Sequence, residues 1–137
     1  MSRQSLAQIY EDYELLEADD RYRLLIDLGR ALEPMPDALK TDATLVRGCS
    51  ASVWVYPTAR PDGRLHFLAD SNAAITKGIV ALVLLAVQDR SPDEIAAADI
   101  EGEFERFDLS NQLSSNRTQG IPNMIALIRE TAARLRR

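Results

Sequence analysis

The chain contains a single cysteine and a single histidine among its 137 residues. One cysteine cannot form an internal disulfide, which predicts a reducing, cytoplasmic setting and a free thiol. A structural zinc site needs several His or Cys ligands in close array, so these counts argue strongly against one. The sequence also lacks a glycine-rich phosphate loop, a dinucleotide fingerprint and a serine elbow. It therefore shows no self-sufficient active site, and we expect no bound cofactor and no bound metal.

Long apolar runs and an excess of positive charge are absent as well. The N-terminus has no apolar leader, and the uncharged run after Lys77 is roughly half the ~20 residues that a bilayer core requires, so we expect no membrane association. The net charge of −5 argues against nucleic acid as a partner. Four arginines near the C-terminus are expected to form a solvated helix end: Arg129, Arg134, Arg136 and Arg137.

The length predicts one domain covering residues 1–137, and the spacing of apolar residues predicts its first elements. Residues 5–17 and a second segment, capped by Asp19 or Asp20, carry apolar side chains at helical spacing. Two prolines follow the second helix, and each disfavours helical geometry in the residue before it. Residues 33–44 are therefore expected to form a connecting loop.

A β-hairpin is expected next. Residues 51–56 are rich in β-branched and aromatic side chains, and this strand is predicted to stop near Pro57. The sequence Arg60-Pro61-Asp62-Gly63 favours a tight turn, after which residues 64–69 alternate as a returning strand with one covered face. Because two strands alone are marginally stable, residues 44–46 are a candidate third strand.

The second half of the chain is predicted to be helical. Asp70 or Ser71 is expected to cap a helix that is apolar almost all round, and that should therefore run through the middle of the domain. Ser91-Pro92-Asp93-Glu94 has the pattern of a capping box with proline at the first helical position. A C-terminal helix with Pro122 in its first turn is expected to bury one face: Ile121, Met124, Ile125, Ile128 and Leu135.

Cys49 lies where a glycine turn meets the first strand. Gly48 gives the backbone angles that are closed to other residues, so the cysteine is expected on a loop crest held by a rigid strand. A free thiol has a pKa of ~8.5, and little of it is thiolate at neutral pH unless a cation is close. The candidate cations are Arg47, Lys77 and Arg117. The sequence thus predicts a reactive thiol that needs a partner to supply the chemistry.

Three separated motifs in register closely resemble the SufE family of sulfur-acceptor proteins. They are Val46-x-Gly48-Cys49 followed by Val53-Trp54, then Asp70-Ser71-x-Ala73-Ala74-Ile75-x-Lys77-Gly78, and last Arg117-x-Gln119-Gly120 with Met124. The order and spacing agree across nearly the whole chain. The resemblance implies an α+β fold like that of the IscU scaffold, in which helices flank a small antiparallel sheet.

The resemblance also implies a function and partners. A pyridoxal-phosphate-dependent cysteine desulfurase of the SufS or CsdA kind carries a persulfide on its own cysteine. A SufE-like protein docks on it, stimulates it, takes the terminal sulfur on its loop cysteine, and delivers that sulfur to a SufBCD-like iron–sulfur scaffold. Cys49 matches the acceptor. In the family this cysteine is sheltered at rest and swings out on docking, which would protect a persulfide.

By the same resemblance, other residues lie at the docking face or support the cysteine loop: Arg47, Gly48, Asp70, Lys77 and Arg117. The chain departs from the usual pattern just after the cysteine. Many relatives have Gln-Ser-Gln before the Val-Trp pair, whereas this chain has Ser50-Ala51-Ser52. The smaller side chains remove amide donors near the sulfur, which affects loop packing and partner preference but leaves the thiol unchanged.

Two other interpretations stay open at this point. In the first, Cys49 is a small buried hydrophobe and the protein is an interaction module that regulates a partner by binding alone. In the second, Cys49 and His66 form the nucleophilic pair of a small thiol hydrolase, since both are predicted on or near adjacent strands. An outward-pointing strand histidine is usually only solvated, so the second interpretation ranks last.

Overall fold

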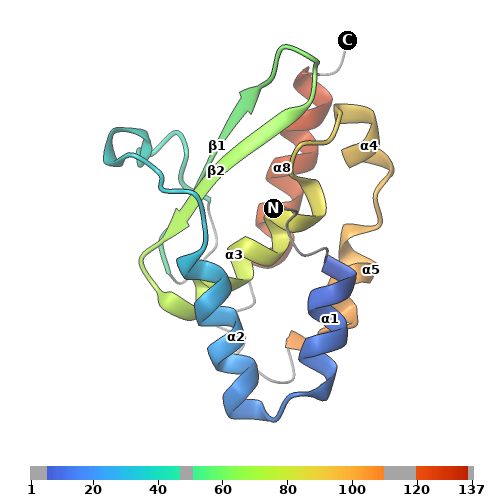
Figure 1. Cartoon of the computed structure of the whole chain (residues 1–137). Helices are drawn as coiled ribbons and strands as arrows, with labels where there is room; N and C mark the ends of the chain where they lie inside the picture. The colour runs from blue at the N-terminus through green and yellow to red at the C-terminus, as the bar shows by residue number, and fades with distance from the viewer. Residues whose placement is uncertain (1–5, 47–50, 110–119, 136–137) are drawn as a thin grey trace.

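A computed structural model describes residues 6–46, 51–109 and 120–135. A two-stranded antiparallel hairpin packs on a central helix, and further helices complete the domain (Figure 1), which confirms the predicted α+β class. The elements in chain order are α1 Leu6–Leu15, α2 Ala18–Arg30, the 3₁₀ helix η1 Asp37–Leu39, β1 Val53–Ala59, β2 Leu65–Ser71, α3 Ala74–Val87, α4 Pro92–Ala97, α5 Ile100–Glu105 and α8 Ile121–Leu135.

The hairpin pairs β1 and β2 from Val53 opposite Ser71 to Ala59 opposite Leu65. The predicted turn is confirmed: the Gly63 N–H donates to the Arg60 carbonyl, and Gly63 has a φ of 87°, in the region that favours glycine. The register sends alternate side chains of each strand to opposite faces. One face of the hairpin therefore joins the core, while the other face carries polar side chains.

The first strand does not stop near Pro57, as the sequence had predicted, but continues to Ala59. Pro57 lies opposite Phe67, whose own backbone N–H and C=O bond to the side-chain amide of Gln88 at 2.7 and 2.8 Å. The backbone of Phe67 therefore points away from β1, and the ladder needs no N–H at this position. This is how a proline fits inside the strand.

Both edges of the hairpin are partly covered. Residues 44–46 form a single bridge to β1 rather than a third strand: the Val46 N–H donates to Val53, and the Val55 N–H donates to Thr44. On the other edge, Leu65 bridges to Arg90. These contacts satisfy edge groups that would otherwise be open to pairing with another chain.

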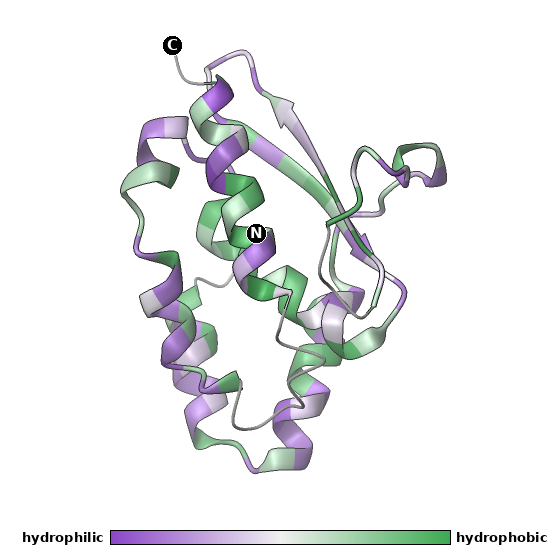
Figure 2. Ribbon diagram, turned by 180° about the vertical axis from the view of Figure 1, so that it is seen from behind, coloured by the Kyte–Doolittle hydropathy of each residue, from purple (hydrophilic) through white to green (hydrophobic). Residues whose placement is uncertain are grey.

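The helix α3 is the centre of the core, as its all-round apolar sequence predicts (Figure 2, where it is largely green). Leu82 and Val83 are 0% exposed. The prediction that Asp70 or Ser71 caps this helix is wrong, because the strand pairing extends through Ser71 and the N-cap is Ala73. The Ser71 hydroxyl accepts a hydrogen bond from the Ala73 N–H instead.

Two glycines bring the backbones of α2 and α3 together. A Cβ added at Gly78 would overlap the carbonyl oxygen of Leu25, and one added at Gly29 would come within 2.9 Å of the Gly78 nitrogen. Such close approach is a role that only a residue without a side chain fills. It places the first turn of α3, including Lys77, against α2.

The remaining helix ends test the capping predictions. The helix α2 begins at Ala18 with Glu17 as a cap that makes no side-chain bond, so Asp19 and Asp20 lie in the first turn, where the helix dipole favours negative charge. At α4 the predicted capping box is present, with reciprocal bonds between Ser91 and Glu94. Within the described ranges, no helix has the length and apolar character needed to cross a membrane.

The C-terminal helix α8 follows the predicted pattern with two exceptions. Met124, Ile125 and Ile128 are buried, but Leu135 is 43% exposed. Arg129 is not part of a solvated end. Its guanidinium donates to the carbonyls of residues 96 and 98 and to the carboxylate of residue 101, and so joins α8 to α4 and α5.

Candidate functional site

The cysteine segment is held on both sides by the hairpin. Residues 47–50, which include Arg47, Gly48 and Cys49, lie outside the described residues, as does Arg117. Before the segment, the Val46 N–H donates to the Val53 carbonyl at 2.8 Å. After it, Ser52 and Asn72 exchange two bonds: the Ser52 N–H donates to the Asn72 side chain, and the Asn72 N–H donates back to Ser52. The chain is therefore fixed on both sides of 47–50.

Asp70 is the centre of a charged cluster beside these attachment points. Its carboxylate binds Lys40 at 2.7 Å through one oxygen and Lys77 at 3.2 Å through the other, and the Ser71 N–H also donates to it. Only 15% of the Asp70 side chain is exposed. The structure thus brings together two of the sequence-predicted residues, Asp70 and Lys77, as a direct ion pair.

Trp54 is the aromatic member of this cluster. It lies directly opposite Asp70 in the hairpin register, and the Lys40 ammonium lies 5.7 Å from the centre of its ring. A cation over an indole face is attracted by the ring quadrupole. Trp54 also forms the bridge to Leu45 in the segment that leads toward Cys49.

The charges of the cluster reinforce one another. Partial burial acts to raise the pKa of Asp70, but hydrogen bonds from Lys40, the Ser71 backbone and Lys77 outweigh it and lower that pKa. Bonds to Asp70 and to Asp37 raise the pKa of Lys40. The carboxylate and the ammonium therefore both keep their charge through the neutral range. We name Lys40, Trp54, Asp70 and Lys77 the cysteine-side cluster.

Lys40 is the member that sequence reasoning missed. It lies in the connection between α2 and β1, nine residues before Cys49, and no motif drew attention to it. The sequence contained one signal, because Lys40 and Lys77 are the only lysines among its sixteen basic residues. In the structure both bind the same carboxylate.

His66 does not occupy the position expected of it. It is 7% exposed, so the expectation of an outward, solvated histidine is wrong. Its Nδ1 lies 2.8 Å from the Asp89 carboxylate and 3.1 Å from the Arg60 guanidinium, and its Nε2 lies 3.0 Å from Glu33. We name these four residues the turn-side cluster.

The position of His66 along the strand argues against a Cys-His pair. His66 lies five residues before Ser71, whose partner Val53 follows the cysteine segment, and five strand residues span about 16 Å. Both ring nitrogens already have partners. His66 therefore belongs to the opposite end of the hairpin from the attachment points of the cysteine segment.

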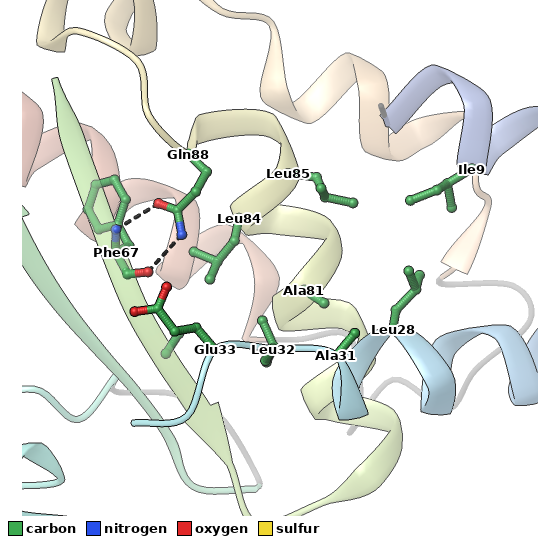
Figure 3. A pocket seen from close by; sticks show the side chains of 11 residues that line it. Ile9, Leu28, Ala31, Leu32, Glu33, Phe67, Ala81, Leu84, Leu85 and Gln88 are labelled. Atoms are coloured by element: carbon green, nitrogen blue, oxygen red, sulfur yellow. Dashed lines mark hydrogen bonds between the residues drawn. The ribbon is translucent and has the colours of Figure 1, made fainter. Parts of the chain in front are cut away.

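An apolar cavity of about 310 Å³ lies between the hairpin and the helices α1, α2 and α3 (Figure 3). Ile9 and Leu28 lie at one end, while Glu33 and the Gln88 amide lie at the other, with that amide bonded to the Phe67 backbone. In the part of the chain that the structure describes, no group of three or more His, Cys, Asp or Glu side chains could hold a metal ion. The lining of the cavity includes none of the residues of the cysteine-side cluster.

Comparison with known proteins agrees with this architecture. The sequence profile of the SufE family, described as an Fe-S metabolism associated domain, matches residues 7–132. An uncharacterized SufE-like protein of Rhizobium etli is 37% identical over 132 residues, with 93% of this chain and 89% of that protein covered. The solution structure of a hypothetical protein from Thermus thermophilus matches with a TM-score of 0.76 over 98% of each chain. At 16% identity, that last likeness speaks for the fold alone.

Proposed function

The chain belongs to the SufE family of Fe-S metabolism associated domains, and on that premise we propose that it carries sulfur on Cys49. The donor is a pyridoxal-phosphate-dependent cysteine desulfurase, which the protein also stimulates. The receiver is a SufBCD-like iron–sulfur scaffold, and the reaction belongs to the cytoplasm. In this scheme the protein is a carrier and activator, and the desulfurase holds the cofactor.

The transfer is a thiol exchange. The Cys49 thiolate attacks the outer sulfur of the donor persulfide, the sulfur–sulfur bond of the donor breaks, and the donor cysteine leaves as a thiolate. One sulfur–sulfur bond forms and one breaks, so no outside oxidant or reductant is required. The protein's task is to bring one accessible thiol to the donor and to hold the product.

The observation that carries this proposal, beyond family membership, is how the cysteine segment is attached. The chain's single cysteine follows Val46, which is bonded to β1, and precedes Ser52, which is bonded to Asn72. The described residues on both sides of the segment are therefore bonded to the hairpin or to the residue that follows it. We assign Arg47, Gly48, Asp70, Lys77 and Arg117 to support of this segment or to docking.

Mass spectrometry tests the assignment directly. Incubation with the desulfurase and free cysteine is expected to add one sulfur atom to the peptide that contains Cys49, and Cys49→Ser should remove both this gain and the stimulation of the desulfurase. The Cys49→Ser variant should unfold at the same denaturant concentration as the wild type. Unchanged desulfurase turnover with Cys49→Ser would instead favour an interaction module that acts by binding alone.

A further inference from the structure

The connection between α2 and β1 is tied to the hairpin by one side chain that no motif includes. Lys40 binds Asp70 at 2.7 Å and Asp37 at 3.2 Å, and its ammonium lies over the Trp54 ring. Its side chain is 23% exposed, although lysine is normally among the most exposed residue types. Lys40 therefore joins η1, β1 and β2 at one point.

The chain between Lys40 and the cysteine segment is rigidly bonded. The Thr44 hydroxyl donates to the Leu39 carbonyl at 2.6 Å and accepts from the Thr41 N–H, and Thr44 is buried. The Thr44 carbonyl in turn accepts the Val55 N–H of β1. Hydrogen bonds thus connect Leu39, the neighbour of Lys40, through Thr44 to β1. Thr44 lies two residues before Val46, the last described residue before the segment that carries Cys49.

The contact between Lys40 and Asp70 matters because the Asp70 carboxylate is poorly exposed and carries a negative charge. A carboxylate that is 15% exposed needs cationic partners, because an unpaired buried charge is costly. Lys77 supplies one partner from α3, but its contact is the longer of the two, at 3.2 Å, and its side chain is more exposed, at 35%. Lys40 supplies the shorter bond, and it is the only one of the two that reaches from the segment before the cysteine.

We propose that Lys40, acting through Asp70 and Trp54, is a positioning residue that holds the chain leading to Cys49 in register on β1. Its functional importance rests on the sulfur-carrier function proposed above. The contacts of Lys40 with Asp70 and Trp54, which we call the clamp, are a property of the free protein. Lys40 does not touch the reacting sulfur. It determines where the segment starts, and therefore how well the thiol meets its donor.

Hydrogen exchange in the free protein tests the clamp without a desulfurase. The Val46 and Val55 amides make the bonds that hold the connection to β1. Lys40→Met keeps most of the stem over Trp54 and removes the charge, and it should speed exchange at these two amides by roughly two- to fivefold, the range that partly exposed ion pairs give. Lys40→Arg restores the charge and should bring exchange back near the wild-type rate.

Arg60→Met is the matched control, since it removes an ion pair of 2.8 Å to Asp89 at the other end of the hairpin. It should leave exchange at Val46 and Val55 unchanged. Unchanged exchange in Lys40→Met would overturn the proposal, and so would an Arg60→Met variant with the same effect, because the loosening would then be general.

The activity measurement separates this proposal from the carrier function. If the wild type accepts sulfur on Cys49, Lys40→Met should lower the maximal transfer rate several-fold and leave the half-saturating concentration of the desulfurase unchanged. If Lys40→Met speeds amide exchange but the wild type accepts no sulfur, the results would support the clamp and contradict the carrier function. A Lys40→Met variant that exchanges faster but transfers sulfur at the wild-type rate would overturn the positioning role.

Discussion

The two ends of the hairpin are built on the same plan with opposite charges. Asp70 and His66 lie four residues apart on β2 and so share its polar face. Each binds one partner from the connection after α2, Lys40 or Glu33, and each binds another from α3 or just beyond it. The connection after α2 is therefore tied at both ends across the hairpin.

The difference lies in what sits at the centre of each cluster. On the cysteine side, a carboxylate lies between two ammonium groups. On the turn side, an imidazole lies between two carboxylates. The Arg60 guanidinium lies 3.1 Å from the Nδ1 atom of this ring and also binds Asp89, so the turn-side cluster contains a cation as well. The chain thus places a carboxylate with two lysine partners, rather than a histidine with two carboxylate partners, beside the cysteine segment.

The largest loss of stability should come from a change at the contact between α2 and α3. Gly78→Ala would drive a methyl group into the backbone of α2 at Leu25, which cannot move aside as a side chain can. We expect a loss of about 3 kcal/mol or more in the free energy of unfolding, measured by urea denaturation. Gly63→Ala has open space around the new methyl group and should cost only about 1 kcal/mol for its positive φ. Equal losses would contradict the close contact of α2 with α3.

The next effect should separate the two ends. His66→Ala leaves Asp89 and Glu33 without their shared partner and opens a cavity, which should cost about 2 kcal/mol in unfolding free energy. His66→Gln keeps one donor and should lose less. Both variants should accept sulfur at the wild-type rate at temperatures well below unfolding. A loss of transfer in these stable conditions would show that the turn side also serves the cysteine.

A smaller effect with a distinct pH dependence is expected at Asp70. Its folded-state pKa is lowered, because the bonds from Lys40, Ser71 and Lys77 outweigh partial burial, so its stabilisation is present above the ordinary aspartate pKa of ~4 and is lost as the pH falls through the lower folded value. Asp70→Asn should cost about 1–2 kcal/mol at neutral pH. The difference from the wild type should shrink below about pH 4. A difference that stays constant into acid would mean that the charge of Asp70 contributes nothing.

The smallest effect should lie away from both clusters. Ser91→Ala removes the capping box of α4 and should cost about 1 kcal/mol, by urea denaturation. Ser91→Asp retains an acceptor for the Glu94 N–H and should recover most of the loss. Neither variant should alter exchange at Val46 or Val55, which makes them a calibration for effects of stability alone.

Sequence reasoning succeeded where a structural feature depends only on residues that are close together in the chain. The Ser91-Pro92-Asp93-Glu94 cap, the turn at Gly63 and the buried helix α3 each depend on neighbours in the chain, and all three were predicted. It failed where the cause was distant. Pro57 fits within β1 because its partner Phe67 directs its backbone groups away from β1 to the side chain of Gln88, and no local pattern contains that pairing.

The same division applies to the candidate site. The motifs indicated Asp70 and Lys77, and the structure brings this pair into contact. They could not indicate Lys40, because its importance arises from crossing the hairpin to reach Asp70 and the Trp54 ring. His66 was misplaced for a related reason: strand alternation predicted which face it lies on, but not that the connection after α2 covers that face.

The sequence by itself determined the α+β class, the family, and the single thiol on which the proposed chemistry depends, since composition, periodicity and motif spacing are properties of the chain alone. Only the tertiary structure decided which charges meet. Ion pairs form between residues that folding brings within a few ångströms, and the two lysines that share Asp70 lie 37 positions apart in the sequence. Their shared carboxylate exists as a site only when α2, α3 and the hairpin are packed together.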